Sequence, residues 1–291
     1  MIPRELLEHI RRIEIRTRRR VQTLFAGEYH SAFKGQGMDF AEVREYVPGD
    51  EVRALDWNVS ARMGSPFVKV FQEERELNML LVVDVSASGR FGSGAKSKRE
   101  WMAELGAVLA FSAMQSRDKA GLILFSDRIE RHVPPAKGTR HGLRLIRDLL
   151  AHEAQGRGTD LGLALQHIQR TQKKRAIIFL ISDFQAPLEP RALRALARKH
   201  DLVALSVRDR LEEFLPPLGL LRVEDLESGR RRWLDASAPA VRAHWARQWA
   251  ARRAGLEQAL RSAAVDHIAL LSGEDPGRPL EQFFLRRSRR A

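Results

Sequence analysis

The sequence predicts an α/β fold with a doubly wound, mostly parallel sheet. Two continuous apolar runs, at 80–83 and 177–181, are typical of strands that are buried on both faces. Helical patterns separate these runs from further strand-like segments, and this alternation is typical of parallel sheets. Asp84 follows the first run and Ser182-Asp183 follow the second. Because open α/β sheets place their sites at the carboxyl ends of strands, we expect the function to lie there.

Composition limits the classes of protein that need considering. A chain of 291 residues favours one large domain with appendages over two independent domains. The formal net charge of +13 makes attraction to nucleic acid or to acidic proteins physically reasonable, but this is a property of the surface. The absence of cysteine excludes disulfides, thiolate metal sites and cysteine nucleophiles.

The first residues and the lengths of the apolar runs indicate the expected cellular location. The first residues lack the apolar core of a secretory signal. No run approaches the roughly 18 apolar residues that a membrane-spanning helix requires. We therefore expect a soluble, cytoplasmic protein.

Residues 1–27 predict a basic amphipathic helix. Apolar residues recur at roughly helical spacing, arginines occupy the opposite face, and Gly27 is a suitable stop. Such a helix can bind nucleic acid or a membrane surface, but a solvated face on a packed helix is the favoured interpretation. Aromatic residues that would stack on bases do not interleave with the arginines.

Residues 28–76 predict a small β-rich appendage. Pro48-Gly49 suits a tight turn, 67–71 alternates like a strand, and a charged link at 73–76 leads to the sheet. The segments 40–46 and 52–57 are too irregular for a helix. A group of charged and aromatic side chains forms either a partner surface or, as we favour, an internal salt-bridge network: Arg44, Asp50, Arg53, Asp56, Trp57 and Arg62.

Residues 77–291 are expected to form the main α/β domain. Helices are expected at 98–114, 141–150, 159–169, 191–198 and from 239 onward, with a short basic helical tail. Strands are expected at 119–126, 129–133, 176–182, 202–207 and 267–271. An insertion at about 209–237 is expected to contain a β-hairpin, formed by 220–225 and 231–235 around the turn Glu227-Ser228-Gly229.

Five oxygen-bearing side chains follow these predicted strands or open a predicted helix: Asp84, Ser86, Ser88, Thr159 and Asp183. Such hard oxygen donors suit Mg²⁺, or Mn²⁺ as its near equivalent. Alternation along 84–88 lets three side chains point to one side of the loop. Since Mg²⁺ takes about six oxygen ligands, this set leaves at least one coordination position for a carboxylate from elsewhere.

The D-x-S-x-S pattern at 84–88, Thr159 within 158–160 and the strand-end Asp183 resemble the three-part metal-ion-dependent adhesion site (MIDAS) of von Willebrand factor A domains. The segment 46–62 resembles the signature of a bacterial family known as domain of unknown function fifty-eight. Together these similarities span about 27–271. The resemblance implies a von Willebrand factor A-like, Rossmann-type fold in which the first and fourth strands of the sheet are neighbours.

The same resemblance implies a function. Members of that family are commonly encoded beside MoxR-type AAA+ ATPases. We therefore expect a non-enzymatic adaptor or co-chaperone that carries Mg²⁺ or Mn²⁺ and grips an acidic side chain of a protein partner. The expected partners are a MoxR-type AAA+ ATPase and a client complex that is matured or remodelled.

Alternative interpretations remain open at this point. Each of the five residues could instead cap a loop or a helix. The stretch 89–97 nearly matches a phosphate-binding loop, which would make the protein a magnesium-dependent nucleotide binder, but Ala95 separates Gly94 from Lys96. A basic nucleic-acid-binding protein is a further alternative. No dinucleotide-binding glycine frame or serine-hydrolase elbow is present.

Overall fold

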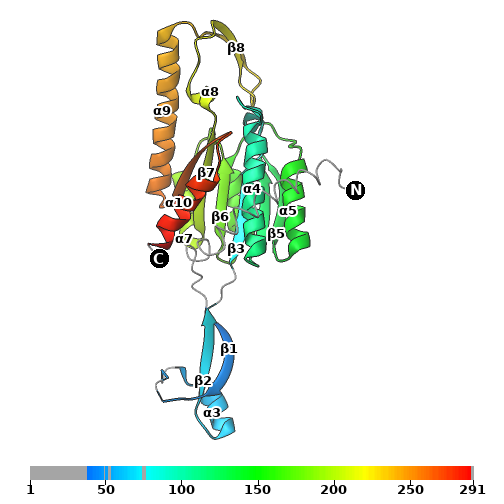
Figure 1. Cartoon of the computed structure of the whole chain (residues 1–291), viewed down its shortest axis with the longest axis vertical. Coiled ribbons are helices and arrows are strands. Elements are labelled where there is room, and N and C mark those ends of the chain that lie inside the picture. Colours follow the sequence, from blue (N-terminus) through cyan, green and yellow to red (C-terminus); the bar gives the residue numbers. More distant parts are fainter. Residues whose placement is uncertain (1–37, 49, 52–53, 74–76, 290–291) are drawn as a thin grey trace. The chain divides into compact units, whose positions relative to one another are not determined.

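The computed structural model describes residues 38–289, except 49, 52–53 and 74–76 (Figure 1). The helix predicted at 1–27 lies outside the described residues, as do the first ten residues of the predicted appendage. The chain divides into two compact units, of which the smaller comprises Phe33–Glu76 and the larger includes Leu77–Ala291.

The smaller unit is built on an antiparallel pair of strands. These are β1 (Met38–Glu45) and β2 (Phe67–Glu73), and the alternating segment at 67–71 lies within β2 as predicted. Between them lies an unpredicted helix, α3 (Trp57–Met63). Asp56 starts this helix by accepting hydrogen bonds from the next turn's backbone, and Gly64 ends it in the left-handed region at φ +76°.

The charged group in this unit is partly an internal network. Arg44 forms a two-pronged ion pair with Asp50, with both nitrogen–oxygen distances at 2.7 Å. The Arg44 guanidinium and the backbone N–H of Val47 hold the pKa of Asp50 below its usual value. Trp57, by contrast, is 72 % exposed and takes no part in a core.

The larger unit contains a six-stranded sheet in the order β10-β7-β6-β3-β4-β5. The strands are β3 (Asn78–Asp84), β4 (Lys119–Phe125), β5 (Ile129–Ala136), β6 (Ile177–Ser182), β7 (Asp201–Arg208) and β10 (Asp266–Leu271). All neighbours are parallel except β5, which pairs antiparallel with β4 at one edge. The predicted doubly wound, mostly parallel α/β fold is confirmed.

Helices cover both faces of this sheet (Figure 1). They are α4 (Lys98–Gln115), α5 (Thr139–Ala151), α6 (Leu161–Thr171), α7 (Pro190–Lys199), α9 (Pro239–Ser262) and α10 (Gly277–Ser288). Leu80 and Val82 of β3 pack on one face with residues of α6, α7 and α9. Every residue of β6 is buried, which explains why its sequence is a continuous apolar run.

The insertion after β7 contains α8 (Arg210–Glu213) and the predicted hairpin, formed by β8 (Leu220–Glu224) and β9 (Arg231–Asp235). This hairpin is a separate two-stranded sheet, and neither strand contains a buried residue. A short 3₁₀ helix, η2 (Ala87–Arg90), follows β3. Within the described part of the chain, no helix is both long and apolar enough to cross a bilayer.

Candidate metal centre

Asp84 and Asp183 lie at the carboxyl ends of neighbouring strands. β3 and β6 pair in parallel, with Val83 opposite Ile181, so the first and fourth strands of the sheet are adjacent as the resemblance implied. The hydroxyl of Ser182 donates a hydrogen bond of 2.7 Å to Oδ2 of Asp84. The fold therefore brings together two acids that are far apart in the sequence.

Asp84 is buried, and its surroundings disfavour its charged form. Only 2 % of its surface is exposed. Burial, and then the negative charge of Asp183, raise the pKa of Asp84 to about 7, although hydrogen bonds from Ser182 and Ser86 oppose this rise. A cation beside these carboxylates would relieve the same unfavourable electrostatics.

Ser86 and Ser88 bring two hydroxyl groups to the same place. The backbone N–H of Ser86 donates to Oδ1 of Asp84 at 2.9 Å, which ties the loop to the end of β3. The hydroxyl oxygens of Ser86 and Ser88 then lie 3.1 Å apart, and both residues are buried. The predicted convergence of the D-x-S-x-S side chains is thus present for Asp84 and the two serines.

Thr159 lies in the loop before α6. This helix begins at Leu161 and is capped by Asp160, so Thr159 lies in the loop and not within the helix predicted at 159–169. The N–H of Ala87 donates to the carbonyl of Arg157 at 3.0 Å, which joins this loop to the serine loop. The Thr159 hydroxyl itself donates to Oε1 of Glu227 at 2.7 Å, and not to the other four site residues.

Asp183 is held by a lysine that the sequence did not single out. Nζ of Lys98 donates to Oδ2 of Asp183 at 2.7 Å and to Oε1 of Glu212 at 2.5 Å. The N–H of Gln185 donates to the other Asp183 oxygen at 3.2 Å. Lys98 is completely buried at the start of α4. Nothing local in the sequence marks Lys98 or Glu212, because they meet Asp183 only through packing.

Lys98 remains charged in this environment. Burial alone would lower the pKa of Lys98, but the nearby Asp183 and Glu212 carboxylates outweigh this effect and raise the pKa above its usual value. The resulting ion pair neutralises part of the negative charge at the end of β6. It also orients Asp183 towards α4.

The residues present suit a divalent cation. Asp84, Ser86 and Ser88 offer hard oxygens in one buried cluster, and the raised pKa of Asp84 shows that burial disfavours its charged form, which a cation would stabilise. Most of the five predicted donors are hydroxyls. Among the described residues, no group of three or more histidine or carboxylate side chains is placed to hold a metal.

The segment 89–97, which nearly matches a phosphate-binding loop, leads into α4, and two of its polar side chains bond to that helix. Ser97 caps this helix, with its hydroxyl accepting from the N–H of Glu100 at 3.2 Å. The ammonium group of Lys96 pairs with Glu104 of the same helix. Both side chains that would contact phosphate and magnesium therefore have structural partners, and the geometry does not favour the nucleotide-binding alternative.

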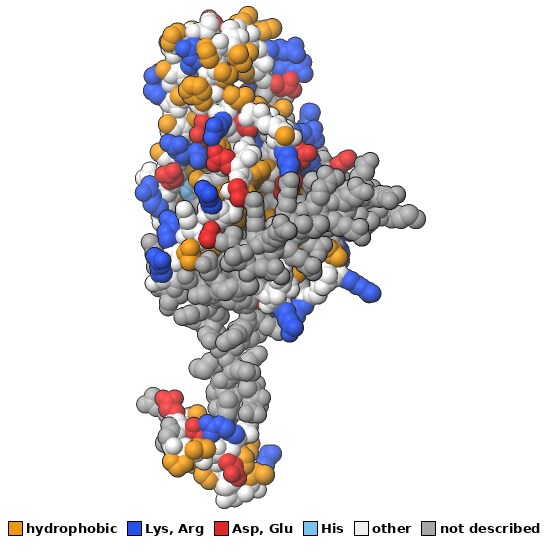
Figure 2. All heavy atoms as spheres, viewed as in Figure 1, with side chains coloured by type: hydrophobic (Ala, Val, Ile, Leu, Met, Phe, Trp, Pro, Cys, Tyr) orange, Lys and Arg blue, Asp and Glu red, His pale blue; other side chains and the backbone are white. Residues whose placement is uncertain are grey.

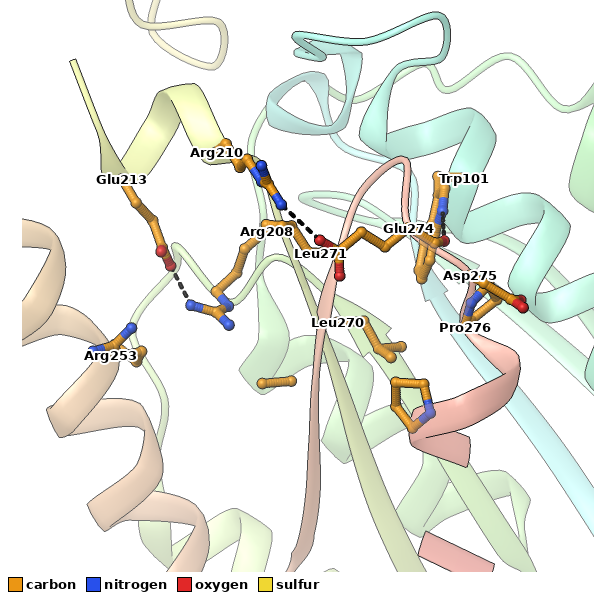
Figure 3. Close-up of a pocket in the computed structure, with 12 residues that line it drawn as sticks. Trp101, Arg208, Arg210, Glu213, Arg253, Leu270, Leu271, Glu274, Asp275 and Pro276 are labelled. Atoms are coloured by element: carbon orange, nitrogen blue, oxygen red, sulfur yellow. Dashed lines mark hydrogen bonds and ion pairs between the residues drawn. The ribbon is translucent and has the colours of Figure 1, made fainter. Parts of the chain in front are cut away.

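A pocket of about 400 Å³ lies at the ends of β7 and β10 (Figure 3). Arg208 pairs with Glu213, and Arg210 pairs with Glu274 at 2.9 Å. The lining contains three arginines and three carboxylates, so it has no excess charge to attract an ionic ligand. None of the five predicted site residues lines this pocket.

Solved structures similar to this chain share low sequence identity with it. BatB from Bacteroides thetaiotaomicron is 15% identical, with a TM-score of 0.48 over 74% of this chain and 100% of that chain. The SpRpn10 VWA domain is 12% identical, with a TM-score of 0.38 over 71% and 95%. Proximal thread matrix protein 1 from the mussel byssus, with a zinc-occupied MIDAS motif, is 14% identical, with a TM-score of 0.36 over 45% and 38%. Similarity at this level implies nothing about the chemistry of this chain.

Sequence relatives are closer. Uncharacterised proteins of Mycobacterium tuberculosis and Mycobacterium bovis are each 30% identical over 274 residues, which cover 93% of this chain and 86% of theirs. The uncharacterised protein YeaD of Bacillus subtilis is 33% identical over 114 residues, covering 38% of this chain and 26% of its own. The model of the family described as "Protein of unknown function DUF58" matches residues 42–255. This protein is a member of the DUF58 family.

Proposed function

We propose that this protein is a divalent-metal-dependent protein–protein interaction module. In this proposal Asp84, Ser86, Ser88, Thr159 and Asp183 hold Mg²⁺ or Mn²⁺ at the carboxyl ends of β3 and β6. The observation that carries it is the 2.7 Å hydrogen bond from Ser182 to Asp84, which joins the two strand ends and brings their acids together.

The chemistry of the donors determines what such a site does. A bound divalent ion would be positively charged, and a partner's carboxylate could coordinate it. Three of the donors are neutral hydroxyls, and Asp183 already shares its charge with Lys98. The protein therefore leaves much of the ion's charge uncompensated, which favours capture of one more acidic side chain. Nothing in this arrangement requires a chemical reaction, so we propose a binding role without enzymatic activity.

The nature of the partner follows from the family resemblance. We propose a cytoplasmic adaptor or co-chaperone that works with a MoxR-type AAA+ ATPase, which would supply the energy to mature or remodel a client. The net charge of +13 would accelerate encounter with an acidic partner.

Partner capture from the native cell extract, with and without EDTA, tests the proposal. Asp84→Ala and the double variant Ser86→Ala/Ser88→Ala should lose most capture, as EDTA should for the unmodified protein. Glu189→Gln is a matched control, because this exposed residue at the start of α7 makes no side-chain capping bond. It should capture the partner normally.

Folding of each variant is checked by circular dichroism before capture is compared. Capture that is identical in EDTA, in Asp84→Ala and in the double variant would refute the metal-dependent mechanism. Identification of the captured proteins by mass spectrometry then tests the ATPase: its absence among metal-dependent partners would refute that part of the proposal.

A further inference from the structure

Thr159 is the most accessible of the five site residues, and an acid from the same chain already contacts it. Asp84, Ser86, Ser88 and Asp183 are each at most 8 % exposed, whereas Thr159 is partly exposed. Its hydroxyl donates to Oε1 of Glu227 at 2.7 Å. A carboxylate therefore contacts the most exposed of the five predicted metal ligands.

The turn between β8 and β9 holds Glu227 in place. Oδ1 of Asp225 accepts hydrogen bonds from the backbone N–H groups of Glu227 and Ser228, at 3.0 and 2.9 Å. Gly229 completes the turn at φ +69°, a left-handed conformation that favours glycine. In the loop that carries Thr159, a Cβ added to Gly158 would lie 3.9 Å from Oε2 of Glu227. The turn thus approaches the Thr159 loop closely.

The hairpin that carries Glu227 contributes little to the core. Neither β8 nor β9 has a buried residue, and Leu220 and Trp233 are 65 % and 67 % exposed. Exposed apolar side chains also gather in the upper part of Figure 2. Moving the hairpin would therefore sacrifice little buried apolar surface, so its displacement is energetically accessible.

We infer that Glu227 is the chain's own carboxylate ligand for the coordination position that a partner's acid would otherwise occupy. This inference rests on the proposed function, because it requires a metal at the five-residue site. The hairpin then acts as an internal competitor: a partner gains access only by displacing Glu227. The partner's apparent affinity for the site equals its intrinsic affinity multiplied by the fraction of molecules in which the hairpin is open.

Mn²⁺ alone is a sufficient probe, because water-proton relaxation reports how many exchangeable waters remain on the bound ion. Glu227→Gln should admit additional water and weaken Mn²⁺ binding by about tenfold. Glu227→Asp keeps the charge but shortens the side chain by one methylene, so it should also admit water. Glu224→Gln is the matched control, because Glu224 lies on the same hairpin and pairs with Arg231. It should behave like the unmodified protein.

The outcomes separate this inference from the proposed function. If the unmodified protein binds no Mn²⁺, the proposed function itself fails. If Mn²⁺ binds and Asp84→Ala abolishes binding, but both Glu227 variants retain the normal hydration, the inference fails and the proposed function stands. An effect of Glu227→Gln without an effect of Glu227→Asp would indicate charge acting through space, and would likewise overturn direct ligation.

Discussion

The ammonium group of Lys98 lies between two carboxylates, one from the end of β6 and one from α8. Its side chain has no exposed surface, while the side chains of Asp183 and Glu212 are 3 % and 10 % exposed. Burying charges costs free energy that only close pairing recovers. Lys98 therefore pairs with Asp183 and holds its side chain in place at the end of β6.

Replacing Lys98 should be costly for stability. Lys98→Met preserves much of the side-chain volume but leaves two buried carboxylates without their cation, so we expect the free energy of unfolding to fall by about 3–5 kcal/mol. Lys96→Met removes a partly exposed ion pair with Glu104 and should cost less than about 1 kcal/mol. Urea denaturation of both variants measures the difference.

A further variant distinguishes lost charge pairing from lost packing. Lys98→Met/Glu212→Gln removes one of the two uncompensated carboxylates and should recover part of the lost stability. If the double variant is no more stable than Lys98→Met, charge pairing is not the cause.

At the level of elements, the loop that carries Thr159 is held by β5. Oε1 of Glu130 accepts from the hydroxyl of Ser126 at 2.7 Å and from the backbone N–H groups of Gln155 and Gly156 at 3.1 and 2.7 Å. Burial opposes ionisation of Glu130, but these hydrogen bonds outweigh it and lower the pKa of this carboxyl. The loop is therefore anchored by a charged side chain that lies outside the proposed ligand set.

Loosening this anchor should weaken metal binding without removing a ligand. Glu130→Gln retains the shape of the side chain but loses the charge that strengthens its hydrogen bonds to the loop, so we expect Mn²⁺ affinity to fall by about tenfold. Isothermal titration calorimetry measures this change. Glu153→Gln alters an exposed glutamate in the same stretch and should leave the affinity unchanged. Equal affinities in the two variants would contradict a positioning role for Glu130.

For the whole molecule, the proposed site couples metal binding to folding. Asp84 and Thr159 belong to segments that meet only when the sheet and its loops are assembled. The unfolded chain therefore lacks the arranged site, and a metal that binds only the folded state must stabilise it.

Metal addition should raise stability by a calculable amount. At a free Mn²⁺ concentration about 100 times the Kd, linkage predicts a gain of about 2.7 kcal/mol in the free energy of unfolding. Thermal denaturation with Mn²⁺, and again after excess EDTA, measures this gain and its reversal. Asp84→Ala should show no metal-dependent change. A gain of equal size in this variant would place the bound metal elsewhere.

Several elements were predictable because their signals are local. Continuous apolar runs predict the buried strands β3 and β6, and strand-like segments around a glycine-containing turn predict the hairpin. Helix α3 was missed because it has only seven residues and no buried residue, so it lacks an apolar periodicity. Thr159 was placed inside a helix because propensity does not show that Asp160, one residue later, caps it.

The sequence by itself determined the alternation of strands and helices and the acids and hydroxyls at the strand ends, because periodicity and loop chemistry are properties of neighbouring residues. Only the tertiary structure decided which distant groups meet those acids. Lys98 lies 85 residues from Asp183, and Thr159 lies 68 residues from Glu227. Such contacts depend on strand order and on how a helix and a hairpin pack near the carboxyl ends of the strands, and no local pattern encodes that packing.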